Sequence, residues 1–402
     1  MKQLNIKDSS VIKLLSYIWI FFFSLTFQAL NMNLILIVSM IFAMLYLLQN
    51  KEALNDWAFR FITVAGLIIA IIDFHAGVYD PLYFALIWPA SYLIGRFMIT
   101  GDDPDKEATI GLGVMTLGIF IQGILNYYNH NEGLEVDNGW GGWNEFWTGT
   151  FSSRTVYVFD FVFIAAWLIF ALIIFKKNKL ASIAIIVLNI IAFLCDFVFA
   201  RGRLCITMQI VVTGSIGLLY LIKERKNITQ RTRKIVICVA VVAVLALIVF
   251  SCAVKLDLFG LKGWYDNSFL SRDGGILGNV RYRSIVEGLV ETVRHPEGGW
   301  NTASLGIAHN VFLLFAKEYD IFVFALLIGY EIVTVSNAIK LAVQKLSASD
   351  YLILACFLAV NLYFMIETCP WRYRNYWFFI LFVGGIIKNK LEYKKILNDI
   401  TQ

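Results

Sequence analysis

The chain has 402 residues, and 59% of them are hydrophobic, against a usual apolar share of about 45–50% in soluble domains. Charged residues make up only 16%, and the mean hydropathy is +0.70. This composition excludes a soluble enzyme, a nucleic-acid-binding protein and a disordered scaffold. It predicts a single integral membrane domain over residues 1–402. The net charge is +5, and its distribution along the chain is more informative than its sum.

The apolar residues fall into repeated runs that are long enough to cross a bilayer. A hydrocarbon core about 30 Å thick needs roughly 20 apolar helical residues. We therefore predict an all-α, polytopic membrane protein with about 12 transmembrane helices. The predicted spans are residues 11–30, 33–49, 59–73, 81–99, 109–125, 156–175, 180–199, 204–222, 235–253, 319–338, 350–366 and 375–387.

The basic residues indicate how these spans are oriented. An even number of spans places both termini on one side, and most of the 34 Lys and Arg lie on that side, most densely at residues 223–234. Because basic residues concentrate in cytoplasmic loops, we expect both termini to be cytoplasmic.

Two of the predicted outer loops are long, namely residues 126–155 and residues 254–318. Within the second loop, the apolar residues of 281–294 recur at helical spacing, and Glu287 and Glu291 lie on the opposite face. We expect this segment to form an amphipathic helix on the outer membrane surface.

The outer segments also collect arginines. A guanidinium pairs bidentately with phosphate, whereas an ammonium is a point charge. An anionic ligand at the outer leaflet, such as a lipid pyrophosphate, fits this composition; the alternative is a set of structural ion pairs at helix ends. The arginines are Arg201, Arg203, Arg281, Arg283, Arg294, Arg372 and Arg374.

Three other features have a functional and a structural interpretation. His309 opens an apolar run, and the positive end of a helix dipole disfavours a charged imidazole there and keeps it available as a base; otherwise it is an interfacial histidine. The acidic stretch 101–105 resembles a cation cluster but falls on the cytoplasmic side, so we expect a solvated loop, no metal and no cofactor. The tryptophans of residues 140–147 suit either sugar stacking or an interfacial belt.

The order and sidedness of several of these residues resemble the O-antigen ligase and polymerase superfamily of bacterial polysaccharide assembly. Its members have about twelve spans, a small-Arg-Gly turn, and a large outer loop in which an arginine and an amphipathic helix precede a His-Pro-x-x-Gly turn and a His-Asn pair. The chain departs from this pattern at Ala200, where serine is frequent, and at Val280, Asn301 and Asp320, where glycine is frequent. The matching residues are Ala200-Arg201-Gly202, Arg281, His295-Pro296, Gly299, His309-Asn310 and Glu318.

The resemblance implies a metal-independent membrane glycosyltransferase of the GT-C type in the bacterial cytoplasmic membrane. Its donor would be an undecaprenyl-pyrophosphate-linked oligosaccharide, bound on the outer face among membrane lipids. Arg201 and Arg281 would hold the pyrophosphate, and His309 would orient or deprotonate the acceptor hydroxyl. The remaining phosphate-binding candidates are Arg203 and Arg283, followed by Arg372 and Arg374.

Three functions stay open. The first is a polymerase that joins lipid-linked repeat units into a capsule, exopolysaccharide or O-antigen, working with other assembly proteins such as a flippase or a chain-length regulator. The second is a ligase that transfers finished glycan to a lipid or protein acceptor. The third is a secondary transporter or flippase, which should carry ionisable groups near the bilayer midplane; Glu331 is the main candidate of that kind.

Overall fold

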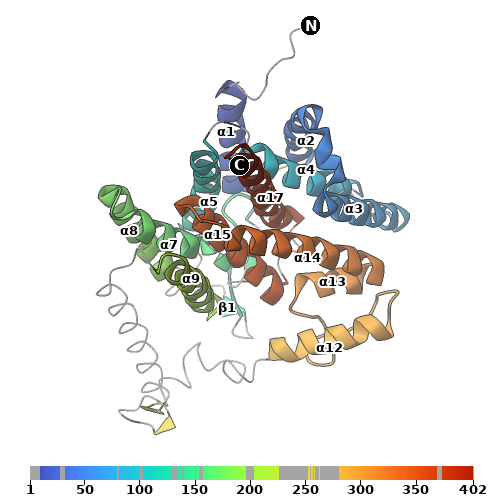
Figure 1. Ribbon diagram of the computed structural model, residues 1–402. Coiled ribbons are helices and arrows are strands. Elements are labelled where there is room, and N and C mark those ends of the chain that lie inside the picture. Colours follow the sequence, from blue (N-terminus) through green and yellow to red (C-terminus); the bar gives the residue numbers. More distant parts are fainter. Residues whose placement is uncertain are drawn as a thin grey trace.

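A computed structural model shows how these segments are arranged (Figure 1). It describes residues 10–27, 32–78, 81–99, 101, 103–128, 135–136, 140–149, 151–153, 157–195, 203–225, 252–253, 255–256, 258, 262, 280–368 and 374–401.

The described residues are predominantly helical and include one small antiparallel sheet. The helices are α1 (Ser10–Thr26), α2 (Met32–Gln49), η2 (Lys51–Asn55), α3 (Trp57–His75), α4 (Tyr83–Phe97), α5 (Pro104–Tyr128), η3 (Val158–Phe161), α7 (Ile164–Ile174), α8 (Lys179–Cys195), α9 (Arg203–Lys223), α12 (Val280–Arg294), α13 (Val311–Glu318), α14 (Ile321–Val343), α15 (Ala348–Ile366), η7 (Arg374–Tyr376) and α17 (Trp377–Thr401). The strands, in sheet order, are β1 (Glu135–Val136), β2 (Trp140–Asn144) and β3 (Phe151–Ser153).

Four of the described helices, α3, α5, α14 and α15, are long and apolar enough to cross a membrane. Helix α8 is shorter, and two of its polar side chains are less exposed than its leucines. Ser182 and Asn189 are buried, whereas Leu180 is 82% exposed. The buried hydroxyl of Ser182 donates to the carbonyl of Ala171 in α7 at 2.6 Å. Polar side chains toward neighbouring helices and leucines toward the surroundings are typical of a helix in lipid. The protein is therefore a membrane-embedded helical protein.

Each predicted span except 235–253 overlaps one of these helices, and of that span the structure describes only residues 252–253. Helices α3 and α5 begin before the predicted spans, because their first turns and caps contain polar residues that a hydropathy scan leaves out. Asp56 caps α3 by accepting from the backbone N–H of Ala58 at 3.1 Å, and α5 starts at Pro104, five residues before the predicted span. The predicted span 156–175 is divided into η3 and α7.

The centre of the bundle is the contact between α4 and α17, which cross without intervening side chains. A Cβ on Gly95 would overlap the carbonyl of Phe382, and a Cβ on Gly385 would overlap the carbonyl of Tyr92. About two turns N-terminal of these glycines in each helix, the rings of Trp88 in α4 and Trp377 in α17 lie 4.5 Å apart. Glycine here permits the close approach that small residues give to helices in membranes.

The small sheet falls within the predicted outer loop 126–155, and polar side chains attach this loop to the end of α5. Gln122 donates to Glu145 at 2.7 Å, and Asn126 accepts from the backbone N–H of Phe146 at 3.0 Å. Trp147 donates through Nε1 to the carbonyl of Leu25 in α1 at 3.1 Å. These contacts place the loop at the C-terminal ends of α1 and α5.

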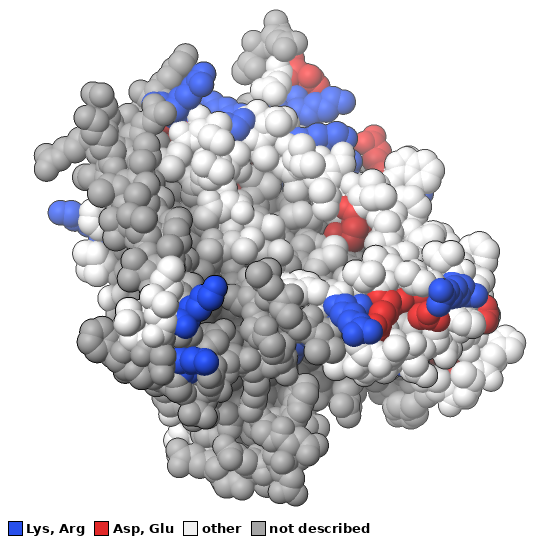
Figure 2. Space-filling model, turned by 90° about the horizontal axis from the view of Figure 1, so that it is seen from below, with Lys and Arg blue, Asp and Glu red and all other residues white. Residues whose placement is uncertain are grey.

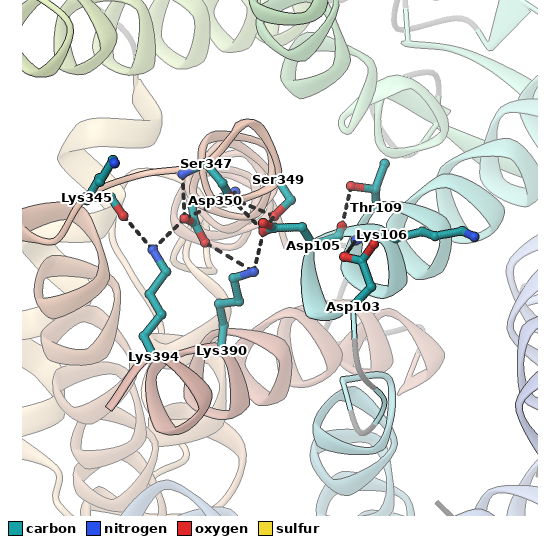
Figure 3. A network of polar contacts seen from close by, with 10 residues as sticks. All are labelled: Asp103, Asp105, Lys106, Thr109, Lys345, Ser347, Ser349, Asp350, Lys390 and Lys394. Carbon is teal, nitrogen blue, oxygen red and sulfur yellow. Dashed lines mark hydrogen bonds and ion pairs between the residues drawn. The ribbon is translucent and has the colours of Figure 1, made fainter. Parts of the chain in front are cut away.

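The charged contacts between helices gather at two separate ends of the bundle. At one, Lys390 of α17 pairs with Asp105 of α5, and Lys394 pairs with Asp350 of α15 at 2.6 Å (Figure 3). Lys223 of α9 reaches the carbonyl of Val343 in α14 at 2.7 Å. We call this the basic end, and it joins the segments whose positive charge predicts the cytoplasmic side. Glu367 lies at the other end of α15, and 19 residues of helix are about 28 Å long.

Candidate functional site

Helix α12 lies at the edge of the molecule and is separated from α14 by α13 (Figure 1). It docks on the segment leading into α13 through small residues, because Ser284 and Thr292 are 0% and 2% exposed. Between them, a Cβ on Gly288 would come within 2.8 Å of the Cβ of Ala308. The strip of Ser284, Gly288 and Thr292 therefore sets a close backbone contact and fixes the direction of α12.

The apolar side chains of α12 stay outside this contact. Val293 is 74% exposed and Val286 is 61% exposed. A charged face adjoins them, and a row of basic and acidic side chains is visible from below where α12 lies (Figure 2). An uncovered apolar face beside a charged face is typical of helices that lie in a membrane interface. The charged face consists of Arg283, Glu287, Glu291 and Arg294.

Arg281, in the first turn of α12, forms an ion pair with Glu367, which caps the C-terminus of α15. The carboxylate side chain is 3% exposed and the guanidinium side chain is 19% exposed. Burial raises the pKa of Glu367, and Arg281 opposes this shift. The pair connects the predicted outer loop to the end of a candidate membrane span.

A single hydroxyl connects Arg281 to His309. Ser284 Oγ donates to the backbone carbonyl of Arg281 at 2.8 Å, and it accepts from the backbone N–H of His309 at 3.3 Å. The structure therefore brings together two of the residues that the resemblance marks as catalytic, Arg281 and His309, although 27 residues separate them in sequence.

His309 lies two residues before the first residue of α13, and its neighbour Asn310 is the N-cap. The Asn310 side chain accepts from the backbone N–H of Leu313 at 3.1 Å, and its Nδ2 donates to the carbonyl of Met365 in α15 at 3.3 Å. His309 is half-buried, and its Nδ1 is enclosed by protein. His309 thus lies at the positive end of α13, beside Asn310, which contacts the C-terminal end of α15.

These contacts close a ring that we call the Arg281 cluster. It runs from α12 to α15 through the ion pair, from α15 to α13 through Asn310, and back to α12 through Ser284. Helix α13 also packs against α4 and α17, because the ring of Phe315 lies 5.5 Å from that of Trp88 and 5.3 Å from that of Trp377. The Arg281 cluster consists of Arg281, Ser284, His309, Asn310 and Glu367.

The turn between α12 and α13 depends on two glycines. Gly298 and Gly299 have φ of 87° and 74°, values that glycine adopts without strain. A Cβ on Gly298 would also come within 2.7 Å of the Lys317 carbonyl, and the backbone N–H of Gly299 donates to that carbonyl at 2.6 Å. The resemblance marks only Gly299, whereas the geometry requires glycine at both positions.

Two residues near the motif have structural contacts. Asp320, where the family often has glycine, is the N-cap of α14 and accepts from the backbone N–H of Val323 at 2.7 Å. Glu318 is partly exposed, and its carboxylate lies 3.9 Å from Lys317 Nζ. The cap explains why the apolar run that follows His309 is divided into α13 and α14.

The other predicted arginines do not join the Arg281 cluster among the described contacts. Arg283 is 75% exposed in its side chain and pairs with Glu287 at 2.8 Å. Arg203 begins α9 and Arg374 begins η7, but the structure does not describe their side chains. Arg201 and Arg372 lie outside the described residues.

The acidic stretch at the start of α5 holds an ion-pair network. Asp105 accepts from Ser347 at 2.7 Å and from Ser349, and it pairs with Lys390 (Figure 3). Over the part of the chain that the structure describes, no group of three or more His, Cys, Asp or Glu side chains could hold a metal ion. The contacts of Asp105 fasten three helices together at the basic end.

Glu367 and Ser284 are the members of the Arg281 cluster that the sequence does not single out. Glu367 is recognisable only as a carboxylate at the outer end of a span. The signal for Ser284 is the small-residue spacing of residues 284, 288 and 292 on a face of α12 without large side chains. The chain matches no protein-family model and no curated protein, so its function is argued from this site.

Proposed function

We propose that the protein is a polymerase that joins lipid-pyrophosphate-linked oligosaccharide repeat units into a surface polysaccharide at the outer face of the bacterial cytoplasmic membrane. One observation carries the proposal: Ser284 links the backbone of Arg281 to that of His309, and both residues lie at the end of the bundle opposite the basic end. This sidedness fits an outer site, because basic segments favour the cytoplasm.

The proposed reaction uses the two groups at different atoms. The acceptor hydroxyl oxygen forms a bond to the anomeric carbon of the donor, and the bond from that carbon to the pyrophosphate oxygen breaks. His309 orients the acceptor and takes the hydroxyl proton. Arg281 offsets the negative charge that develops on the departing pyrophosphate. Arg201 would share this role, and Arg203, Arg283, Arg372 and Arg374 remain further candidates for phosphate binding.

The environment of the Arg281 cluster suits a lipid-linked donor. The exposed apolar face of α12 would lie in the outer leaflet, which places the first turn of the helix near the lipid phosphates. Arg281 is in that turn. A polyprenyl chain could then stay in the bilayer while its pyrophosphate reaches the guanidinium, and both termini would be cytoplasmic.

The direct test uses the purified protein in lipid nanodiscs with an undecaprenyl-pyrophosphate oligosaccharide. A polymerase produces a ladder of longer lipid-linked glycans. Transfer of the glycan to a different lipid or protein acceptor would instead identify a ligase. An unchanged donor, in nanodiscs where the protein is folded, would contradict both enzymes.

His309→Ala should abolish the ladder while the protein remains in the membrane. His295→Ala is a matched control, because His295 follows α12, is exposed, and contacts Glu291 and Glu297 at the rim of the helix. A full ladder from His309→Ala would remove the imidazole from the mechanism. Loss of the ladder in both variants would show that the outer loop responds to any change.

One observation favours a second candidate, a proton-coupled transporter or flippase. Glu331 lies near the middle of α14, is 5% exposed, and neither carboxylate oxygen has a hydrogen-bond partner among the described residues. A lone carboxyl inside a membrane often marks a proton path. It is separated from the Arg281 cluster by the first half of α14 and by α13.

Substitution distinguishes the two candidates. Glu331→Gln keeps the shape of the side chain but cannot ionise, so it should abolish proton-coupled transport and leave glycan elongation intact. Uptake of a fluorescent lipid-linked oligosaccharide into proteoliposomes with an imposed pH gradient measures transport. Gradient-dependent uptake that Glu331→Gln abolishes would favour the transporter over the polymerase.

A further inference from the structure

The guanidinium that would bind the donor already has a counter-anion inside the protein. Glu367 accepts from Nη1 of Arg281, and its side chain is 3% exposed. A buried carboxylate beside a guanidinium cancels much of the positive potential that an incoming anion would otherwise meet. Binding of a pyrophosphate must therefore overcome this internal pair.

The attachment of the helices does not depend on this ion pair alone. Asn310 links α13 to the C-terminal end of α15 through the carbonyl of Met365, and Ser284 links α12 to His309. In addition, the strip of Gly288 packs against Ala308. With three other contacts in place, a charged and buried Glu367 is not needed merely to hold the fold together, and an isolated structural pair of this kind contributes little net stability.

The geometry also limits how Arg281 can share its donors. A guanidinium has five N–H donors in a planar fork, and one carboxylate takes at most two of them. The guanidinium therefore has more donors than Glu367 takes, and a phosphate that binds Arg281 would compete with Glu367 for the same fork. The carboxylate would then fix the orientation of the guanidinium and at the same time lower its affinity for the phosphate.

We propose that Glu367 is a positioning residue that orients Arg281 and competes with the donor pyrophosphate for it, so that the lipid pyrophosphate product is released. This inference rests on the proposed function, because it assigns a role to Glu367 at the same site. It names a pyrophosphate as the ligand of Arg281 and a carboxylate as the group that limits its affinity.

Glu367→Gln tests the competition, because glutamine keeps the shape and can still accept from Arg281 but carries no charge. With farnesyl pyrophosphate as the probe, calorimetry in nanodiscs should show affinity about tenfold higher than wild type, since a charge-assisted competitor becomes a neutral one. In elongation assays, both KM and kcat should fall, because the product leaves more slowly. A merely structural role would lower kcat without tightening the probe.

Two further variants make the result specific. Glu291→Gln removes a carboxylate from the same outer region, where it pairs with Arg294 at 3.0 Å, and it should leave probe affinity and both kinetic constants unchanged. Glu367→Asp keeps the charge but shortens the reach, so its affinity should lie between those of wild type and Glu367→Gln. If Glu367→Gln does not fold, affinity of Glu367→Asp above wild type supports competition, and affinity at or below wild type overturns it.

The outcomes separate this inference from the proposed function. If the wild type elongates glycan but Glu367→Gln binds the probe no more tightly, competition is overturned and the polymerase stands. If the wild type neither binds farnesyl pyrophosphate nor elongates glycan, both proposals fall. Tighter binding combined with the joint decrease of KM and kcat supports both.

Discussion

Arg281 and Glu367 form an ion pair across 86 residues of sequence, between the first turn of α12 and the C-cap of α15. The pair joins a segment outside the candidate spans to a span itself. It also means that a substitution at Arg281 changes the surroundings of a buried carboxylate. Loss of activity in a variant of Arg281 is therefore ambiguous until folding and chemistry have been separated.

A double substitution separates them. Arg281→Gln alone leaves Glu367 buried without its partner, which should cost about 3 kcal/mol of stability. Arg281→Gln combined with Glu367→Gln removes both charges and should recover most of that loss. Both proteins should fail to elongate glycan. Thermal unfolding in detergent measures the recovery, and an active double variant would rule out a catalytic role for Arg281.

Ser284→Ala should weaken activity by disconnecting His309 from α12. It removes the hydrogen bond to the Arg281 carbonyl and the one from the His309 N–H, each worth about 1 kcal/mol. Where the transition state loses both contributions, about 2 kcal/mol, the rate of elongation in nanodiscs should fall by about 30-fold.

Thr292→Ala is the matched control for Ser284→Ala. It deletes a buried hydroxyl from the same strip, but that hydroxyl donates within α12, to the carbonyl of Gly288 at 2.7 Å. Its rate should stay near wild type while its stability decreases slightly. Equal losses of activity in both variants would show that packing of α12, rather than the link to His309, controls the rate.

Acid should loosen the segment that leads into α13. Hydrogen bonds from the hydroxyl and the backbone N–H of Ser304, together with Arg283, hold the pKa of Glu287 below its usual value. The folded state therefore binds fewer protons than the unfolded state near this pKa, so stability increases with pH there. The contribution is complete above the unfolded pKa of about 4.3 and is lost as the pH falls through the folded value.

Hydrogen exchange at the Ser304 amide measures this effect. The protection factor of this amide in the wild type, which is the ratio of the intrinsic to the observed exchange rate, should decrease on acidification from about pH 6 to pH 3. In Glu287→Gln the amide should already be weakly protected at pH 6, with little further change. A wild-type protection factor that does not vary over this range would contradict the assignment.

Gly385→Ala should destabilise the bundle more than any exchange on its surface. The new Cβ would overlap the Tyr92 carbonyl, and overpacking of this kind costs about 1–3 kcal/mol or more. Gly217→Ala in α9 is the control, because among the described residues a Cβ there would meet no atom of another helix within 4 Å, and alanine is the better helix former. The melting temperature in detergent should fall for the first variant and stay level or increase for the second.

The sequence predicts the positions of the helices well, because a run of apolar residues is itself the physical requirement for crossing a bilayer. It predicts their ends less well. Asp56 and Pro104 are polar or helix-starting residues that lie beyond the apolar runs, and hydropathy gives them no weight. The count of about 12 spans stays a prediction, because residues 235–251 lie outside the described part.

The local part of the site is also visible in the sequence. The helix expected over residues 281–294 corresponds to α12, and His309 lies at the start of a helix as expected. The partner of Arg281 is not predictable, because many carboxylates are available and only the tertiary fold, which brings the C-cap of α15 to the first turn of α12, selects Glu367. The cap at Asp320 has a sequence signal, because an aspartate directly before an apolar helical run is typical of an N-cap.

The crossing of α4 and α17 has a consequence for biogenesis. These helices belong to opposite ends of the chain, at Tyr83–Phe97 and Trp377–Thr401, and synthesis proceeds from the N-terminus. The surface of α4 around Gly95 must therefore remain without its packing partner until α17 has been synthesised. The contact between α4 and α17 can therefore form only after α17 has been synthesised and inserted, and until then other groups, such as surrounding lipid, must cover this surface of α4.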